Sequence, residues 1–108
     1  MGANSVKTIG QDGTLSANSA IVTADGTVLA ENARRLWWGI VNLDTDAVLV
    51  KLGAGASAVD FNIPLKACAV TDDGSGGAFF DDTHTGIVSI KASAGAPRVS
   101  VIEMNKEF

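Results

Sequence analysis

The chain has 108 residues, of which 46% are hydrophobic and 19% charged, and its formal net charge is −4. This length suits one domain with a modest core, and the apolar share excludes a generally disordered chain. The chain has only 8 Lys and Arg residues and no basic cluster longer than Arg34-Arg35. Because nucleic acids and anionic membrane surfaces attract basic patches, we predict neither a nucleic-acid nor a membrane partner.

The N-terminal sequence MGANSVKTIGQDG lacks a basic start followed by an apolar stretch, so no secretory signal is expected. No apolar run approaches the length that spans a bilayer. Cys68 is the only cysteine, which excludes an intrachain disulfide. It lies in an apolar run, where a small buried hydrophobe is expected rather than a nucleophile. These features fit synthesis and folding in a reducing cytoplasm.

Residues 1–33 are rich in Gly, Asn, Ser and Thr, with short apolar islands. Residues 1–12 are predicted to be a flexible arm that orders only against a partner, and residues 13–108 to be a single β domain. The dipeptides Asp12-Gly13 and Asp25-Gly26 favour tight turns. The sequence DGTLSANSA at 12–20 is similar to DGTVLAENA at 25–33, which indicates two similar hairpins.

Residues 34–53, RRLWWGIVNLDTDAVLVKLG, contain two apolar runs around a polar segment at 42–46. Runs of this composition around a short polar loop predict a β-hairpin. In its first strand, alternation places Leu36, Trp38 and Ile40 on one face. Both tryptophans of the chain lie in this strand, so much of the aromatic area available for burial does too.

Further short strands are expected over residues 59–63, 65–71, 78–80, 87–93 and 98–104. The connecting segments include a small-residue loop at 53–57 and DDGSGG at 72–77. No stretch shows a sustained helical pattern with caps. The sequence therefore predicts an all-β fold, a single-domain antiparallel β-sandwich or a jelly-roll-like barrel.

Gly53, Gly55 and Ala58 match the loosest pattern of a dinucleotide-binding loop. That loop requires a following helix to hold the pyrophosphate, and residues 59–63 alternate like a strand instead. We interpret the match as a turn and predict no cofactor.

His84 is the only histidine and lies in the acidic segment 81–86, downstream of Asp72 and Asp73. These groups lack the ligand spacing of a zinc or calcium site, so solvated turns are expected and no metal site is predicted. No nucleophile-elbow motif positions an activated serine. We therefore predict no catalytic residues and no enzymatic activity.

Trp37 and Trp38 point to opposite faces of a regular strand, so one is expected in the core. The other requires cover from the same chain or from a partner protein. Leu36 and Ile40 lie on the face of Trp38, which assigns Trp38 to the core. We predict an interface that contains Trp37, since tryptophan is enriched at binding hot spots, and that includes the neighbouring Arg34 and Arg35.

The chain resembles small virion proteins of tailed bacteriophages over about residues 28–104. Shared features are an Asn and an Arg pair before an apolar strand, an Asn turn, a second strand, a Gly-Ala-rich loop and an Asp-Phe pair. In this sequence they are Asn32, Arg34-Arg35-Leu36, Ile40-Val41-Asn42, Val48-Leu49-Val50-Lys51-Leu52, Gly53-Ala54-Gly55-Ala56, Asp60-Phe61, Leu65-Lys66-Ala67, the 72–77 loop and Thr85-Gly86. Trp37-Trp38 departs from the pattern, because aliphatic residues usually follow the Arg pair.

The resemblance implies a virion component, such as a capsid decoration protein or a head- or tail-associated β domain. Of these we expect a capsid decoration or stabilising protein bound to the outer shell in many copies. The resemblance implies the major capsid protein or other virion proteins as partners, a homo-oligomer with a trimer favoured, and location in the virion. The family brings no catalytic or ligand residues to this chain. A rival interpretation is a tail or fibre domain that binds a host-surface glycan or protein. An exposed Trp near Asp and Asn favours it, but Tyr is absent.

Overall fold

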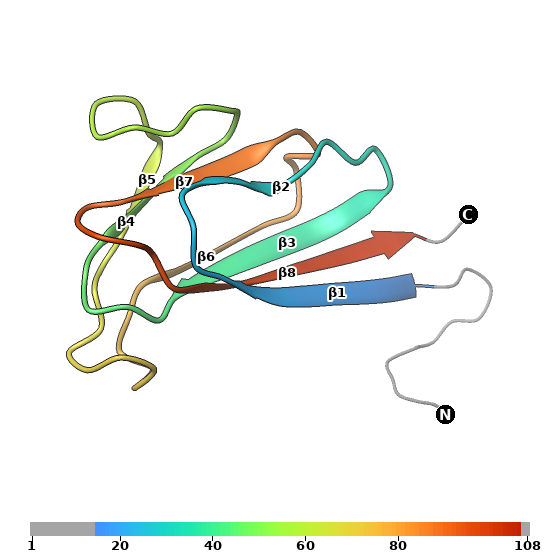
Figure 1. Ribbon diagram of the computed structural model, residues 1–108. Coiled ribbons are helices and arrows are strands. Elements are labelled where there is room, and N and C mark those ends of the chain that lie inside the picture. Colours follow the sequence, from blue (N-terminus) through green and yellow to red (C-terminus); the bar gives the residue numbers. More distant parts are fainter. Residues whose placement is uncertain (1–14, 107–108) are drawn as a thin grey trace.

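The computed structural model describes residues 15–106, which form eight β-strands and no helix (Figure 1). The strands are β1 (Leu15–Val22), β2 (Gly26–Leu29), β3 (Arg35–Asn42), β4 (Val48–Lys51), β5 (Ile63–Leu65), β6 (Ala78–Asp81), β7 (Val88–Ala92) and β8 (Val99–Lys106). They pair antiparallel in two four-stranded sheets. The first sheet has the order β1-β8-β3-β6 and the second β2-β7-β4-β5. The predicted all-β sandwich is confirmed.

The core lies between the two sheets and consists of inward-facing apolar side chains of both. Apolar alternation along the strands produces this arrangement, since every second residue of a strand faces the partner sheet. The buried cluster comprises Trp38, Ile40, Val48, Val50, Leu65, Val88, Ile90, Val99 and Val101. Trp38 is fully buried, which confirms its assignment to the core, and its ring packs on Phe79 with 5.7 Å between ring centroids.

The predicted hairpin over residues 34–53 is wrong. Its two strands exist as β3 and β4, but they belong to different sheets, and the connection crosses the sandwich. Asn42 is fully buried at this crossing. Its amide nitrogen donates to the carbonyls of Asp46 and Leu65, and its amide oxygen accepts the N–H of Asp44. These bonds satisfy a buried polar side chain and fix the crossing.

Several other predicted boundaries also change. Only β5 forms within the two strands expected over 59–63 and 65–71, and residues 66–77 form a loop. The turn at Asp25-Gly26 does not close a hairpin, because β1 and β2 lie in different sheets (Figure 1), and the turn at Asp12-Gly13 lies outside the described residues. The predicted arm at 1–12 lies outside the described residues.

Leu36 does not share a face with Trp38, because β3 contains a bulge between Arg35 and Trp37. A bulge adds one residue to a strand and reverses the alternation on one side of it. Leu36 is therefore 38% exposed, and Arg35 occupies the inward position. The bulge accordingly moves a charged side chain into the sandwich.

Candidate functional site

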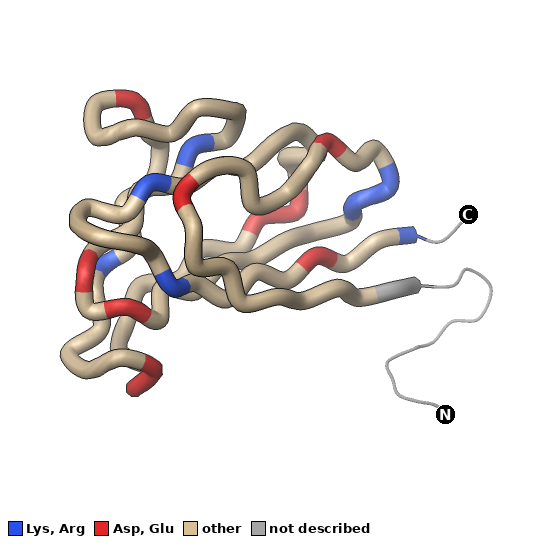
Figure 2. Tube along the Cα trace, in the orientation of Figure 1, with Lys and Arg blue, Asp and Glu red and all other residues tan. Residues whose placement is uncertain are grey.

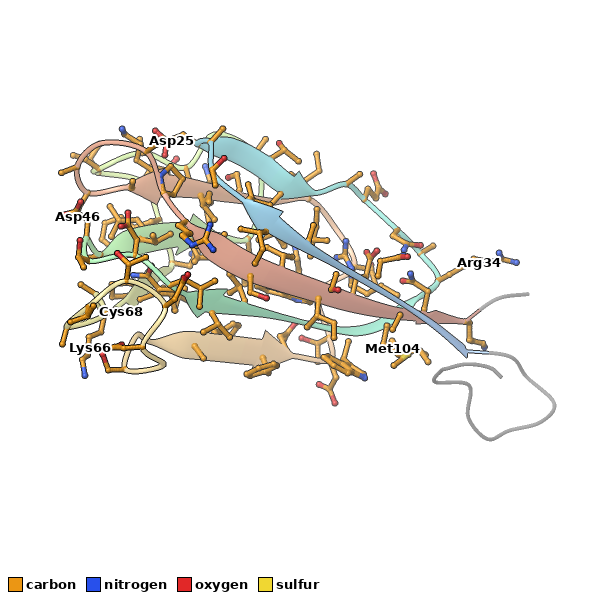
Figure 3. The ribbon with its side chains drawn as sticks, turned by 60° about the horizontal axis from the view of Figure 1, so that its bottom comes forward. Asp25, Arg34, Asp46, Lys66, Cys68 and Met104 are labelled. Carbon is orange, nitrogen blue, oxygen red and sulfur yellow. The ribbon has the colours of Figure 1, made fainter. Side chains whose placement is uncertain are left out.

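Among the described residues, the outer face of the first sheet, directed away from the second sheet, carries one charged side chain, that of Lys106 at the end of β8. Alternation assigns to this face the residues whose strand neighbours point into the core. They are Ala17, Ser19 and Ile21 of β1, Ser100, Ile102, Met104 and Lys106 of β8, Trp37, Gly39 and Val41 of β3, and Ala78 and Phe80 of β6. Figure 3 shows Met104 on this face, near the end of the sheet at which Arg34 lies. We call this set the outer face.

The opposite side of the sandwich is polar and partly covered. On the second sheet, Lys51 forms an ion pair with Asp60, and Lys91 forms one with Asp25. The hydroxyl of Ser89 bonds to the loop that follows β4 and holds that loop against the sheet. Figure 2 shows most charged positions in loops and at strand ends. Because antiparallel sheets usually present polar residues to water, the outer face of the first sheet is the exception.

Trp37 of β3 and Phe80 of the edge strand β6 form an aromatic pair on the outer face. Their ring centroids are 6.3 Å apart at an interplanar angle of 54°. With Asp81 and Asp82 they line an open depression of about 540 Å³. Phe80 is 58% exposed, and Ile21, on the same face but in the opposite edge strand β1, is 50% exposed. The outer face therefore leaves large apolar side chains in contact with solvent.

The carboxylate of Asp81, at the rim of this depression, is engaged within the chain. It accepts hydrogen bonds from Trp38 Nε1 at 3.2 Å, from the backbone N–H of His84 at 2.7 Å, and from the N–H and hydroxyl of Thr83. Burial acts to raise the pKa of Asp81, but these donors outweigh burial and lower it. Asp82 is exposed beside it. Of the two carboxylates, Asp82 is the one placed to meet a ligand.

The structure separates the three residues of the predicted interface. Trp37 is half-buried on the outer face. Arg34 is exposed and points away from the end of the sheet (Figure 3). Arg35 is buried in the interior, so its guanidinium is inaccessible and we remove it from the contact surface. The predicted interface did not include Phe80 or Met104, which also lie on the outer face. For Met104 the sequence held a signal, because alternation in the last strand places it on the same side as Ser100 and Ile102.

Arg35 joins three parts of the sandwich through its guanidinium. Its Nε donates to the carboxylate of Glu103 in β8 at 2.8 Å. Its other nitrogens donate to the carbonyls of Ala30, His84 and Gly86 at 2.7–3.1 Å. A planar guanidinium suits this arrangement, because it presents several donors in fixed directions. Arg35 therefore has a structural role.

Glu103 receives three polar partners in this interior cluster. Burial acts to raise the pKa of its carboxyl group, but hydrogen bonds from Arg35, Asn32 and Asn105 together lower the pKa. Asn32 also donates to Asn105 at 2.8 Å. The cluster thus keeps a negative charge stable between the sheets, and its hydrogen-bonding capacity is used internally.

The acidic segments are not brought together. Asp72 forms a two-point ion pair with Arg98, and Asp73 accepts hydrogen bonds within its own loop. A ring nitrogen of His84 lies 2.9 Å from the carbonyl oxygen of Ile87. Within residues 15–106, no group of three or more His, Cys, Asp or Glu side chains is arranged to hold a metal ion.

Comparison of the chain with protein-family models, with curated proteins and with solved structures found no match. In the described part of the chain, no helix is long and apolar enough to cross a membrane.

Proposed function

We propose that this chain is a structural protein of a tailed-phage virion, a capsid decoration protein that binds the outer shell in many copies. The observation that supports this most is the largely apolar outer face, charged only at Lys106, with Trp37 and Phe80 beside its β6 edge. Contiguous exposed apolar surface on a soluble protein marks an interaction site more often than it marks anything else. The sequence resemblance supplies the class of partner, a virion shell protein.

The chemistry of the outer face suits a protein partner. Fully desolvated contact regions are depleted in charge and enriched in aromatic residues and Met, and the outer face has this composition. Trp37 is held by its strand and by Phe80, so little side-chain freedom is lost on binding. Repeated sites on a shell add multivalency to the modest affinity of one small face.

The proposal assigns the chain no enzymatic activity. The strongest titratable candidates each serve the fold: Asp81 holds the loop after β6, and Glu103 neutralises Arg35. Cys68 is buried, and its thiol donates to the carbonyl of Asn42.

Copy number per particle tests the proposal. Virions of the phage that encodes the chain are purified, and the chain is quantified by mass spectrometry against the major capsid protein. The proposal expects a copy number that scales with the capsid lattice. Absence from purified virions would refute a structural role in the particle, and a few copies per particle would place the chain in the tail.

A second candidate is a tail or fibre domain that binds a host-surface glycan. The specific observation in its favour is the open depression that combines Trp37 and Phe80 with the exposed carboxylate of Asp82. Sugars stack on aromatic rings and donate hydrogen bonds to carboxylates. Titration of the isolated chain with host-surface polysaccharide, followed by tryptophan fluorescence, tests it, and a Trp37→Phe variant with an unchanged response would exclude stacking on Trp37.

A further inference from the structure

The edge strands of the sandwich differ in how they resist pairing with another chain. In the second sheet, β5 has three residues and contains Pro64, and β2 is irregular between Thr27 and Leu29. In the first sheet, β6 has four residues and ends at Asp81. Short length, proline, irregularity and charge are all features that protect sheet edges. These three edges are therefore protected.

β1 has none of these features. It is eight residues long, with the sequence LSANSAIV, and contains no charged residue and no proline. It pairs with β8 in an unbroken register from Leu15 to Val22. Within residues 15–106 no strand pairs with its other edge. A long, regular and uncharged edge is a template for another strand.

The backbone groups directed toward this free edge follow from the antiparallel pattern. The N–H of Lys106 bonds to the carbonyl of Arg34, and the carbonyl of Arg98 accepts from Leu43. Even-numbered residues of β8 therefore bond toward β3, and odd-numbered ones toward β1. With the observed register, even-numbered residues of β1 bond to β8. Ala17, Ser19 and Ile21 consequently direct their N–H and C=O groups outward.

We propose that a second copy of this chain pairs with β1 along this edge, antiparallel and about a two-fold axis normal to the sheet. The two first sheets then form one continuous eight-stranded sheet. The outward-bonding residues are also those whose side chains lie on the outer face. Pairing Ser19 with Ser19 of the second copy, or with Ala17 of the second copy, therefore satisfies the hydrogen bonds and keeps both outer faces on one side.

A second copy fits this edge for reasons that concern β1 itself. An isologous pair matches two strands of equal length, and the absence of charge removes like-charge repulsion across the axis. The exposed Ile21 then lies inside a doubled apolar face instead of at its margin.

A groove beside β1 adds apolar area to this pairing. The space between the two sheets is open here, with a cavity of about 170 Å³. Its lining consists of Asn18, Ser19, Ala20, Val28, Leu29, Val101 and Glu103. A strand added to β1 directs small side chains toward this groove and covers the apolar part of its lining.

Sedimentation equilibrium of the full chain, alone in solution, tests the proposal. We expect a concentration-dependent mass of two chains. Ser19→Pro removes an outward N–H twice per dimer without removing a bond to β8, so dimerisation should weaken about tenfold or more. Ser19→Thr keeps the N–H and is the matched control, with unchanged dimerisation.

Two variants with opposite charges at position 19 test the same pairing if the proline variant does not fold. Ser19→Lys and Ser19→Glu each place like charges near the two-fold axis and should be more monomeric than wild type. Mixing the two variants places opposite charges there and should restore a dimer of one of each. A monomeric wild-type chain at about 1 mM, or an oligomer that none of these variants alters, would overturn the proposal. Because no particle is present, the result is independent of shell binding.

Discussion

The ring of Phe80 lies directly on the backbone of Gly39, its neighbour across β3 and β6. A Cβ atom at position 39 would lie 2.2 Å from Cδ2 of the Phe80 ring. The glycine thus provides the space that the ring occupies, and the ring covers a residue with no side chain. The ring of Trp37 pairs with that of Phe80 on the same face of the sheet.

Gly39→Ala should therefore lower the free energy of unfolding by about 1–3 kcal/mol through overpacking. In a Phe80→Ala background the same change should cost much less, because the space is vacant. Denaturant unfolding of both single variants and the double variant measures the coupling. Additive effects would show that the ring does not depend on the glycine.

The adjacent arginines should respond in opposite ways to truncation. Arg35→Ala removes the positive charge that pairs with the Glu103 carboxylate and the side-chain donor to three carbonyls, which should cost about 3–5 kcal/mol. Arg34→Ala removes an exposed side chain and should change stability by less than about 0.5 kcal/mol. Thermal and denaturant unfolding of the two variants decide this, and equal effects would contradict the internal role of Arg35.

Acid should destabilise the fold through Glu103. Its folded-state pKa is below the ordinary value of 4.5, so the stabilisation is complete above that value. As the pH falls, the unfolded chain binds a proton at this carboxyl group first, and stability declines through the folded-state pKa. Glu103→Gln should be less stable than wild type at neutral pH but should lose less stability between about pH 5 and pH 3. A slope identical to wild type would remove Glu103 as a cause of acid sensitivity.

Chelation should leave the melting temperature unchanged. Arg98 neutralises Asp72, and the carboxylate of Asp73 accepts hydrogen bonds from the hydroxyl and backbone N–H of Ser75. Melting with EDTA, and again after adding calcium, checks this expectation. A drop of many degrees that calcium reverses would establish an acidic-loop metal site.

The β-sandwich was predictable because apolar alternation recurs in short segments. The pairing of strands was not, because a five-residue polar connection such as 43–47 suits a hairpin or a crossing between sheets. The hydrogen bonds of the buried Asn42 fix the crossing, and its partner on β5, the carbonyl of Leu65, is remote in sequence. The bulge at Leu36 was equally hidden, since it depends on pairing with β8.

The division between Trp37 and Trp38 followed from the period of a strand. The rest of the outer face did not, because it assembles from four strands whose order is set by long-range pairing. Arg35 illustrates the converse error. The adjacent Arg34 and Arg35 suggested an exposed surface, but the fold buries Arg35 in an ion pair with Glu103.

We propose that the outer face docks on the virion shell through Trp37. The decisive measurement is the occupancy of Trp37→Ala on purified virions, with Leu49→Ala, on the solvent side of the second sheet, as the matched control. Both isolated variants should remain folded, whereas Trp38→Ala should lose about 3–5 kcal/mol of stability. We predict that Trp37→Ala weakens binding by about 2 kcal/mol or more, about a thirtyfold loss of affinity, and that Leu49→Ala retains wild-type occupancy. Wild-type occupancy of a folded Trp37→Ala variant would contradict the claim.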